Sequence, residues 1–331
     1  MTRLILICGS SGASRLIKAG LADVALTLDR QLVWGALPSK AELGAFFERL
    51  TDQRKGLHWQ DYSPAWRVEQ AGAKGLGLVE YCARCDSVAL WSNPEPSAQL
   101  SLIWLLDHLR AHEELVSRLT LIQGNLAITS EPADKIAKLP GLAVRLRDEH
   151  LALASIAWQA YRASTPQAWR NLLDQDLSVL PKLRETVVEM LEELPSETSG
   201  LGATEMRILE LIAEGGKVPS DVFPGHQSRN ERRVFDYWEF GEILDGLVRC
   251  RNPAVSGLEE GPFSVEMQRN RERSERYAQS KLSLTALGKA ILAGTEDFAR
   301  HNPIHRWWGG TELTSDRLWR WDATKRTLVA P

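Results

Sequence analysis

The chain has few cysteines, no long apolar segment and almost no net charge. Four cysteines in 331 residues do not make a disulfide framework, so we expect a reducing compartment. No apolar run reaches the ~18 residues of a membrane span. The run Leu4–Cys8 is too short for the apolar core of a signal peptide. The 40 basic and 43 acidic residues give a formal charge of −3, which provides no bulk attraction for nucleic acid or acidic lipid. These absences predict a cytoplasmic protein without a membrane partner.

The rest of the composition is that of a globular protein. Hydrophobic residues make up 44% and charged residues 25%, which excludes a disordered or fibrous chain. A length of 331 residues favours two domains over one. Twelve tryptophans are the unusual feature, and four of them lie within residues 307–321.

The first 145 residues alternate strand and helix patterns. Leu4–Cys8 is apolar on both faces, as a buried parallel strand requires, and further strands are expected at 23–28, 87–91 and 118–123. Ser39 is a predicted N-cap, with Glu42 three residues later completing a capping box. A helix over 97–109 has leucines at core-facing spacing. We therefore predict an α/β fold class, with a three-layer domain over residues 1–145 built on a mainly parallel sheet.

Residues 146–331 do not continue the alternation of strands and helices. Residues 146–199 form a predicted helical extension that ends in the polar linker 196–200. Residues 200–331 are predicted to form a winged-helix-like α+β module, with helices over 203–213 and 237–249 and a strand at 281–284. Thr285 is expected to cap the next helix. Alternation around Trp319 and Trp321 predicts a closing β-meander.

A set of short motifs is spread over nearly the whole chain. They are Ile5-Leu6-Ile7-Cys8-Gly9-Ser10, Leu90-Trp91 with Ala98-Gln99-Leu100, Leu180-Pro181-Lys182-Leu183, Gly200-Leu201-Gly202-Ala203-Thr204-Glu205, Leu284-Thr285-Ala286-Leu287-Gly288, Arg306-Trp307-Trp308-Gly309-Gly310 and Trp319-Arg320-Trp321-Asp322. Their order and spacing resemble the long form of a bacterial family known as domain of unknown function eighteen-thirty-five. The resemblance implies no activity, since that family has none assigned. The chain departs from the family pattern at Ser10, where an acidic residue is expected, and at Gly35-Ala36, where a Gly-Pro pair is expected.

The loop after the first strand is the main candidate site. A loop between a buried strand and a helix, at the carboxyl edge of a sheet, offers backbone N–H groups to an anion. It matches neither the dinucleotide-binding nor the P-loop motif, so an ordinary turn with serine caps is the alternative. The candidate ligand-binding residues are Gly9, Ser10, Ser11, Gly12, Ser14, Asp29 and Gln99.

The same loop fits a relaxed nucleophile elbow with Ser11 as the nucleophile. That chemistry needs a base histidine, an orienting acid and an oxyanion-hole donor from an earlier strand loop. No strand precedes Leu4–Cys8 in the sequence, so that donor has no source. No catalytic residue is therefore predicted.

Cysteines and histidines give no metal site. Cys82 and Cys85 form a single C-x-x-C without a second pair, and a strand rather than a helix follows it. His108 and His112 have helical i, i+4 spacing without an identifiable third ligand. His301 and His305 have the same spacing, but Pro303 lies between them. No metal or cofactor is predicted.

A basic segment suggests a nucleic-acid contact. Residues 269–281 are predicted to be the β-ribbon wing, and a basic ribbon can follow a phosphate backbone. The candidate contacts are Arg269, Arg271, Arg273 and Arg276. Glu239, Glu242 and Asp245 on the preceding helix would repel DNA, so DNA binding is not favoured.

The tail tryptophans could stack a base or a sugar, but core packing is the preferred interpretation, because a small sheet needs large side chains to anchor it.

We expect a non-enzymatic binding or regulatory protein whose N-terminal sheet edge takes a small anion or nucleotide. The alternative is an enzyme on a phosphorylated or nucleotide substrate at that edge, using Ser10, Ser11, Asp29 and Gln99. Further alternatives are a DNA-binding regulator and a scaffold for a protein partner.

Overall fold

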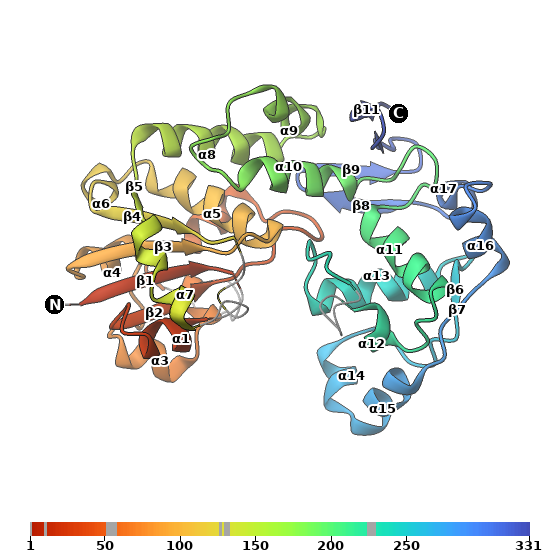
Figure 1. The fold of residues 1–331 in the computed structure, drawn as a ribbon, viewed down its shortest axis with the longest axis horizontal. Coiled ribbons are helices and arrows are strands. Elements are labelled where there is room, and N and C mark those ends of the chain that lie inside the picture. Colours follow the sequence, from red (N-terminus) through yellow and green to blue (C-terminus); the bar gives the residue numbers. More distant parts are fainter. Residues whose placement is uncertain (1, 10–11, 51–57, 126–127, 129–132, 224–229) are drawn as a thin grey trace. The chain divides into compact units, whose positions relative to one another are not determined.

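The computed structural model describes residues 2–9, 12–50, 58–125, 128, 133–223 and 230–331 (Figure 1). The chain divides into two units, each with its own internal packing. The first contains Met1–Val33, Leu37–Ala163 and Asn171–Thr186, and the second contains Trp34–Ala36, Ser164–Arg170 and Val187–Pro331. The main division therefore falls between Thr186 and Val187, whereas the sequence analysis starts the C-terminal module at residue 200.

A five-stranded sheet with the order β2-β1-β3-β4-β5 lies at the centre of the first unit. Its parallel strands are β1 (Arg3–Cys8), β2 (Val24–Leu28), β3 (Ser87–Ser92) and β4 (Leu119–Gln123), and β5 (Val144–Arg145) runs antiparallel to β4. The register places Cys8 opposite both Leu28 and Ser92, so three parallel strands end at one level. The mainly parallel sheet predicted from the sequence is confirmed, and each predicted strand end is within one residue.

Helices cover both faces of this sheet (Figure 1). On one face, α1 (Ala13–Lys18) and α7 (Ala133–Ile136) pack on a core that includes Ile7, Trp91 and Ile122. On the other face, α5 (Pro96–Leu109) lies between the sheet and α8 (Asp148–Tyr161). Because α5 is covered on two sides, it is apolar around most of its circumference. It begins one residue before the predicted start, since proline suits the first helical position.

Short helices complete the first unit. They are α2 (Lys40–Ala45), η1 (Trp59–Tyr62), α3 (Ala65–Gln70), α4 (Leu78–Ala83), α6 (Glu113–Val116), η2 (Leu139–Leu142) and η3 (Leu172–Asp174), while α9 (Gln167–Asn171) and α10 (Leu183–Glu192) contain residues of both units. The capping box predicted for α2 is present. Ser39 Oγ accepts from Glu42 N at 3.3 Å, and Ser39 N donates to Glu42 Oε2 at 2.8 Å.

The second unit combines helices with short antiparallel pairs. Its helices are α11 (Ala203–Ala213), α12 (Pro219–Val222), α13 (Tyr237–Arg249), α14 (Val265–Arg269), α15 (Arg271–Gln279), α16 (Ala286–Leu292) and α17 (Phe298–His301). β6 (Val255–Ser256) pairs with β7 (Ser283–Leu284). The cap predicted for the helix after β7 is confirmed, because Thr285 Oγ1 accepts from Gly288 N.

The basic β-ribbon predicted over 269–281 is wrong, because this segment is helical. α14 ends at Arg269, and Asn270 caps α15 by accepting from Arg273 N at 3.1 Å. Ion pairs at i, i+4 spacing then support the α15 helix. The segment also contains no β-branched residue, a signal against a ribbon that was present in the sequence.

The tail forms two separate hairpins rather than the predicted meander. β8 (His305–Trp308) pairs with β9 (Thr311–Thr314), and β10 (Arg320–Asp322) pairs with β11 (Thr327–Val329). The predicted linker 196–200 lies within this unit, since Glu197 N donates to Trp321 O and Trp321 N donates to Pro195 O. The prediction of a meander is wrong because Trp321 of the β10–β11 hairpin pairs with Ser196 rather than with a residue of β9.

Candidate functional site

The strand order reverses at the carboxyl edge of the sheet. After β1 the chain goes to β2 on one side, and it later returns to β3 on the other side. The connections after β1 and β3 therefore diverge, and in open α/β sheets ligands bind where the strand order reverses in this way. Gly9 follows β1 and Asn93 follows β3 at this point.

Gly9 and Asn93 lie against each other at this edge of the sheet. Gly9 has a φ of 130°, and a Cβ placed on it would lie 2.6 Å from Asn93 Nδ2. Asn93 N donates to Cys8 O at 3.2 Å, and Asn93 Oδ1 accepts from Ile128 N at 3.3 Å. Because the oxygen of this amide accepts from the backbone, the Nδ2 donor is the end that faces Gly9.

A chain of amides supports the β3 and β4 ends. Gln99 is 1% exposed, and its Nε2 donates to Ser92 Oγ at 2.9 Å and to Asn93 O at 2.6 Å. Gln99 Oε1 accepts from Gln123 Nε2 at 2.9 Å. A carbonyl oxygen can only accept, so this chain fixes the orientation of the Gln99 amide. The two strand ends are thus held in one hydrogen-bonded geometry.

Two arginines reach the first turn of α1. Arg15 Nη1 donates to Ile128 O at 2.8 Å, and Arg67 Nη2 donates to Ser14 Oγ at 2.8 Å. Arg67 Nε is a buried donor without a hydrogen-bond partner. These guanidinium groups bring positive charge close to the loop that precedes α1.

The predicted ligand residues have several positions around this edge. Gly9 and Gln99 belong to the network described above, and Ser14 holds Arg67. Gly12 has a φ of 120°, and a Cβ there would lie 2.7 Å from Ile128 Cγ2. Asp29 follows β2. Burial, and to a smaller extent the nearby Asp29, raise the pKa of Cys8 to about 12. Ser10 and Ser11 lie outside the described residues.

Sequence reasoning missed Asn93, Gln123 and the two arginines. Asn93 could have been found, because it follows the predicted strand 87–91 closely, as Gly9 follows the first strand. Arg67 could not, since it comes from α3, 53 positions away from its partner Ser14.

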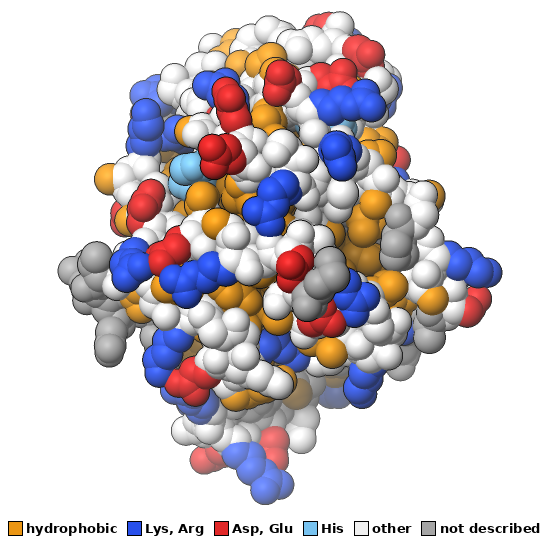
Figure 2. Space-filling model, turned by 90° about the vertical axis from the view of Figure 1, so that its left-hand side faces the viewer, with side chains coloured by type: hydrophobic (Ala, Val, Ile, Leu, Met, Phe, Trp, Pro, Cys, Tyr) orange, Lys and Arg blue, Asp and Glu red, His pale blue; other side chains and the backbone are white. Residues whose placement is uncertain are grey.

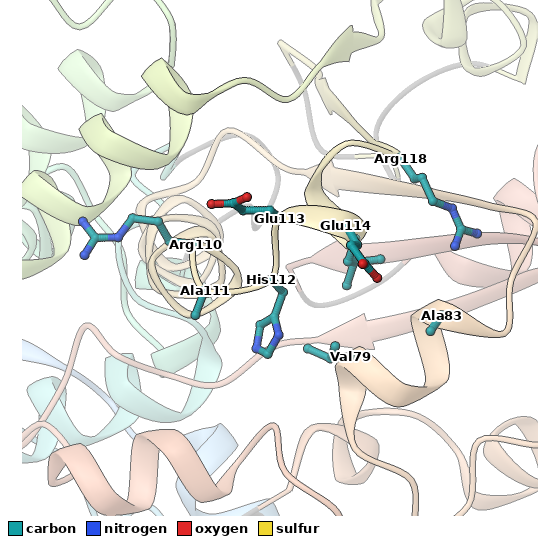
Figure 3. Close-up of a pocket in the computed structure, with 9 residues that line it drawn as sticks. Val79, Ala83, Arg110, Ala111, His112, Glu113, Glu114 and Arg118 are labelled. Carbon is teal, nitrogen blue, oxygen red and sulfur yellow. The ribbon is translucent and has the colours of Figure 1, made fainter.

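A separate pocket of about 590 Å³ lies at the opposite edge of the sheet (Figure 3). Its wall includes Arg118, which directly precedes β4. Figure 3 shows His112 and Glu114 pointing toward α4, whereas Arg110 points away. The lining mixes both charges without a buried polar network, so it indicates no particular ligand.

The histidines and cysteines near this pocket do not form a metal centre. The His108 and His112 rings lie 5.7 Å apart, and burial and the neighbouring imidazole lower the pKa of His108. Cys82 and Cys85 are free and buried, and burial raises the pKa of both thiols. Among the residues that the structure describes, no three His, Cys, Asp or Glu side chains come together to hold a metal ion.

The arginines of the predicted wing form ion pairs within their own unit. Arg271 pairs with Glu275 at 2.7 Å, and Arg273 and Arg276 both pair with Glu260 at 3.3 and 2.8 Å. Arg269 ends α14. Figure 2 shows the side of the first unit, where acidic and basic side chains are interspersed. Arg271, Arg273 and Arg276 thus do not form the unpaired basic stripe that a phosphate backbone attracts.

Helix α13 carries a buried carboxyl group. Glu239 is 8% exposed, and burial, with Asp236 as the next cause, raises its pKa to about 8.

We expect Glu239 to make the protein less stable as pH rises. Its pKa is near 4.5 ordinarily and about 8 when folded, so the unfolded chain loses this proton first. The destabilisation starts above about pH 4.5 and is complete above about pH 8. Urea unfolding across this range should show a decline in the wild type that Glu239→Gln reduces. Parallel pH profiles for the two proteins would contradict the assignment.

Comparison with protein families and with curated proteins gives no relative. No protein-family model and no curated protein matches the chain. In the described parts of the chain, no helix combines the length and the apolar character needed to cross a membrane. The interpretation of the site therefore depends on its geometry.

Proposed function

We propose that this is a non-enzymatic binding or regulatory protein whose first unit takes a small anion, such as a phosphate or a nucleotide. The observation that carries the proposal is the meeting of Gly9 and Asn93 at the point where the strand order reverses. Glycine at position 9 allows the Asn93 amide to lie close to the backbone where β1 ends.

The surrounding chemistry supports an anion. Asn93 Nδ2 is a donor beside Gly9. Arg67 donates to Ser14 in the first turn of α1, and Arg15 from the same turn donates to Ile128 O. Arginine holds phosphate and carboxylate through several N–H donors at once. The buried Gln99 chain favours binding because it orders the strand ends before a ligand arrives.

We expect inorganic phosphate or a nucleotide to raise the melting temperature of the protein. A ligand at ~100 times its Kd contributes about 2.7 kcal/mol, which corresponds to a few degrees. Arg67→Met should remove most of this shift. The matched control is Arg49→Met, since Arg49 is exposed and pairs with Glu80 on the α4 helix.

A panel of ATP, GTP and phosphate that leaves the melting temperature unchanged would refute the proposal. Turnover of a bound nucleotide would instead favour the alternative of an enzyme at the same edge. In that case Asp29 and Gln99 would be the first described residues to test.

We propose finer assignments for the rest of the molecule. α11, α12 and α13 followed by the β6–β7 hairpin suggest a winged-helix-like module, with α14 and α15 in the place of a wing. The quoted motifs suggest a divergent member of the family of unknown function eighteen-thirty-five. The free thiols favour a cytoplasmic location. The paired arginines give no support to DNA binding.

A further inference from the structure

The N-terminal part of α13 presents aromatic rings beside carboxylates in the second unit. We call Trp34, Tyr237, Trp238, Glu239 and Glu242 the α13 patch. Tyr237 is 46% exposed and Trp238 is 40% exposed, which is unusual for such large rings. Trp34 belongs to the same unit and joins the patch through Glu242.

Contacts with two phenylalanine rings hold the exposed Tyr237 and Trp238 rings in place. Tyr237 stacks on Phe223 with centroids 4.8 Å apart and meets Phe263 edge-on at 4.9 Å. Trp238 lies 5.4 Å from the same Phe263 ring. Because these contacts fix the rings, a ligand that stacks on them has little side-chain motion to restrict.

Glu242 adds negative charge to the patch, and Glu239 adds a buried carboxyl oxygen. Glu242 Oε2 accepts from Trp34 Nε1 at 2.6 Å. Glu239 is 8% exposed, and its Oε2 is buried without a hydrogen-bond partner. Arg249, in the last turn of α13, pairs with Asp245. An unpaired buried carboxyl oxygen is costly, so a donor that reaches it would be stabilised.

We propose that the α13 patch binds an arginine side chain of a polypeptide partner. A guanidinium group is planar, so it can stack on Trp238 or Tyr237 while its N–H groups face the Glu242 carboxylate. Helical spacing places Trp238 and Glu242 at i, i+4, on one face of α13. This surface is independent of the anion site in the first unit.

Titration calorimetry with the full-length protein tests the proposal. The probe is a peptide of alternating glycine and arginine, and its control has the neutral isostere citrulline in place of arginine. We expect the arginine peptide to bind at least about tenfold more tightly than the citrulline peptide.

Two variants separate the aromatic and the charged parts of the patch. Trp238→Ala removes a ring, and Glu242→Gln removes a charge but keeps an oxygen that can accept from Trp34 Nε1. Each should weaken binding of the arginine peptide about tenfold. Trp66→Ala and Glu259→Gln are the controls, because both side chains are exposed and lie outside the patch. They should bind as the wild type does.

Absence of binding at ~1 mM peptide would overturn the proposal, since a Kd above ~1 mM is too weak for a specific partner. Equal binding of the two peptides, or unchanged binding in Trp238→Ala and Glu242→Gln, would overturn it as well. Unchanged melting temperatures of the variants show that any loss reflects the patch rather than unfolding.

Discussion

Arg232→Met is expected to destabilise the protein by about 3–5 kcal/mol, because it leaves a buried carboxylate without its cation. The Glu193 side chain is 4% exposed, and its Oε1 accepts from Arg232 Nε at 2.7 Å and from Thr204 Oγ1 at 2.6 Å. Its Oε2 accepts from Thr204 N at the start of α11. Burial raises the pKa of Glu193, and Arg232 opposes that rise.

Urea unfolding measures this loss, and two further variants identify its cause. Glu193→Gln added to Arg232→Met should recover part of the stability, since the unpaired charge is then absent. Arg207→Met breaks ion pairs with Glu210 and Glu214, which are more exposed, and should cost about 1 kcal/mol or less. Equal losses for Arg232→Met and Arg207→Met would contradict the role of burial.

Trp308→Ala is expected to destabilise the protein by about 3–5 kcal/mol, the usual cost of deleting a large buried aromatic side chain. Trp308 is 4% exposed, its Nε1 donates to Met190 O at 2.7 Å, and its ring lies 6.4 Å from Trp169. Truncation therefore removes buried area and leaves the Met190 carbonyl without this donor.

Trp307→Ala is the matched control for this prediction. Trp307 is the neighbour of Trp308 in β8, and it is only partly buried because successive strand residues face opposite sides. Its replacement should cost about half as much or less. Equal losses measured by urea unfolding would contradict the assignment of Trp308 to the core and Trp307 to the surface side.

The sequence was sufficient for features that depend on neighbouring residues. The apolar run Leu4–Cys8 and three further strand patterns predicted the parallel sheet, because a strand buried on both faces reads as a continuous apolar segment. Ser39 and Thr285 were recognised as caps, since capping depends on residues one turn apart.

Features that depend on distant contacts were not predictable. The sequence treated Trp307 and Trp308 alike, and only the packing of Trp308 against Met190 and Trp169 shows which of them is buried. Residues 269–281 were assigned to a ribbon by their position in an expected motif, although their i, i+4 charge pairs favoured a helix. Within the candidate site, Gly9 was visible as a loop residue, but its contact with Asn93 required the order of the strands.

The amide NMR spectrum of the full-length protein during titration with phosphate and with ATP is the most direct measurement of the central proposal. If the anion binds where the strand order reverses, the resonances of Gly9, Gly12 and Asn93 should shift and saturate together with the ligand. Arg67→Met should weaken these shifts, and Arg49→Met should not. Saturable shifts confined to other residues, or no saturable shift with either ligand, would contradict an anion site at this edge of the sheet.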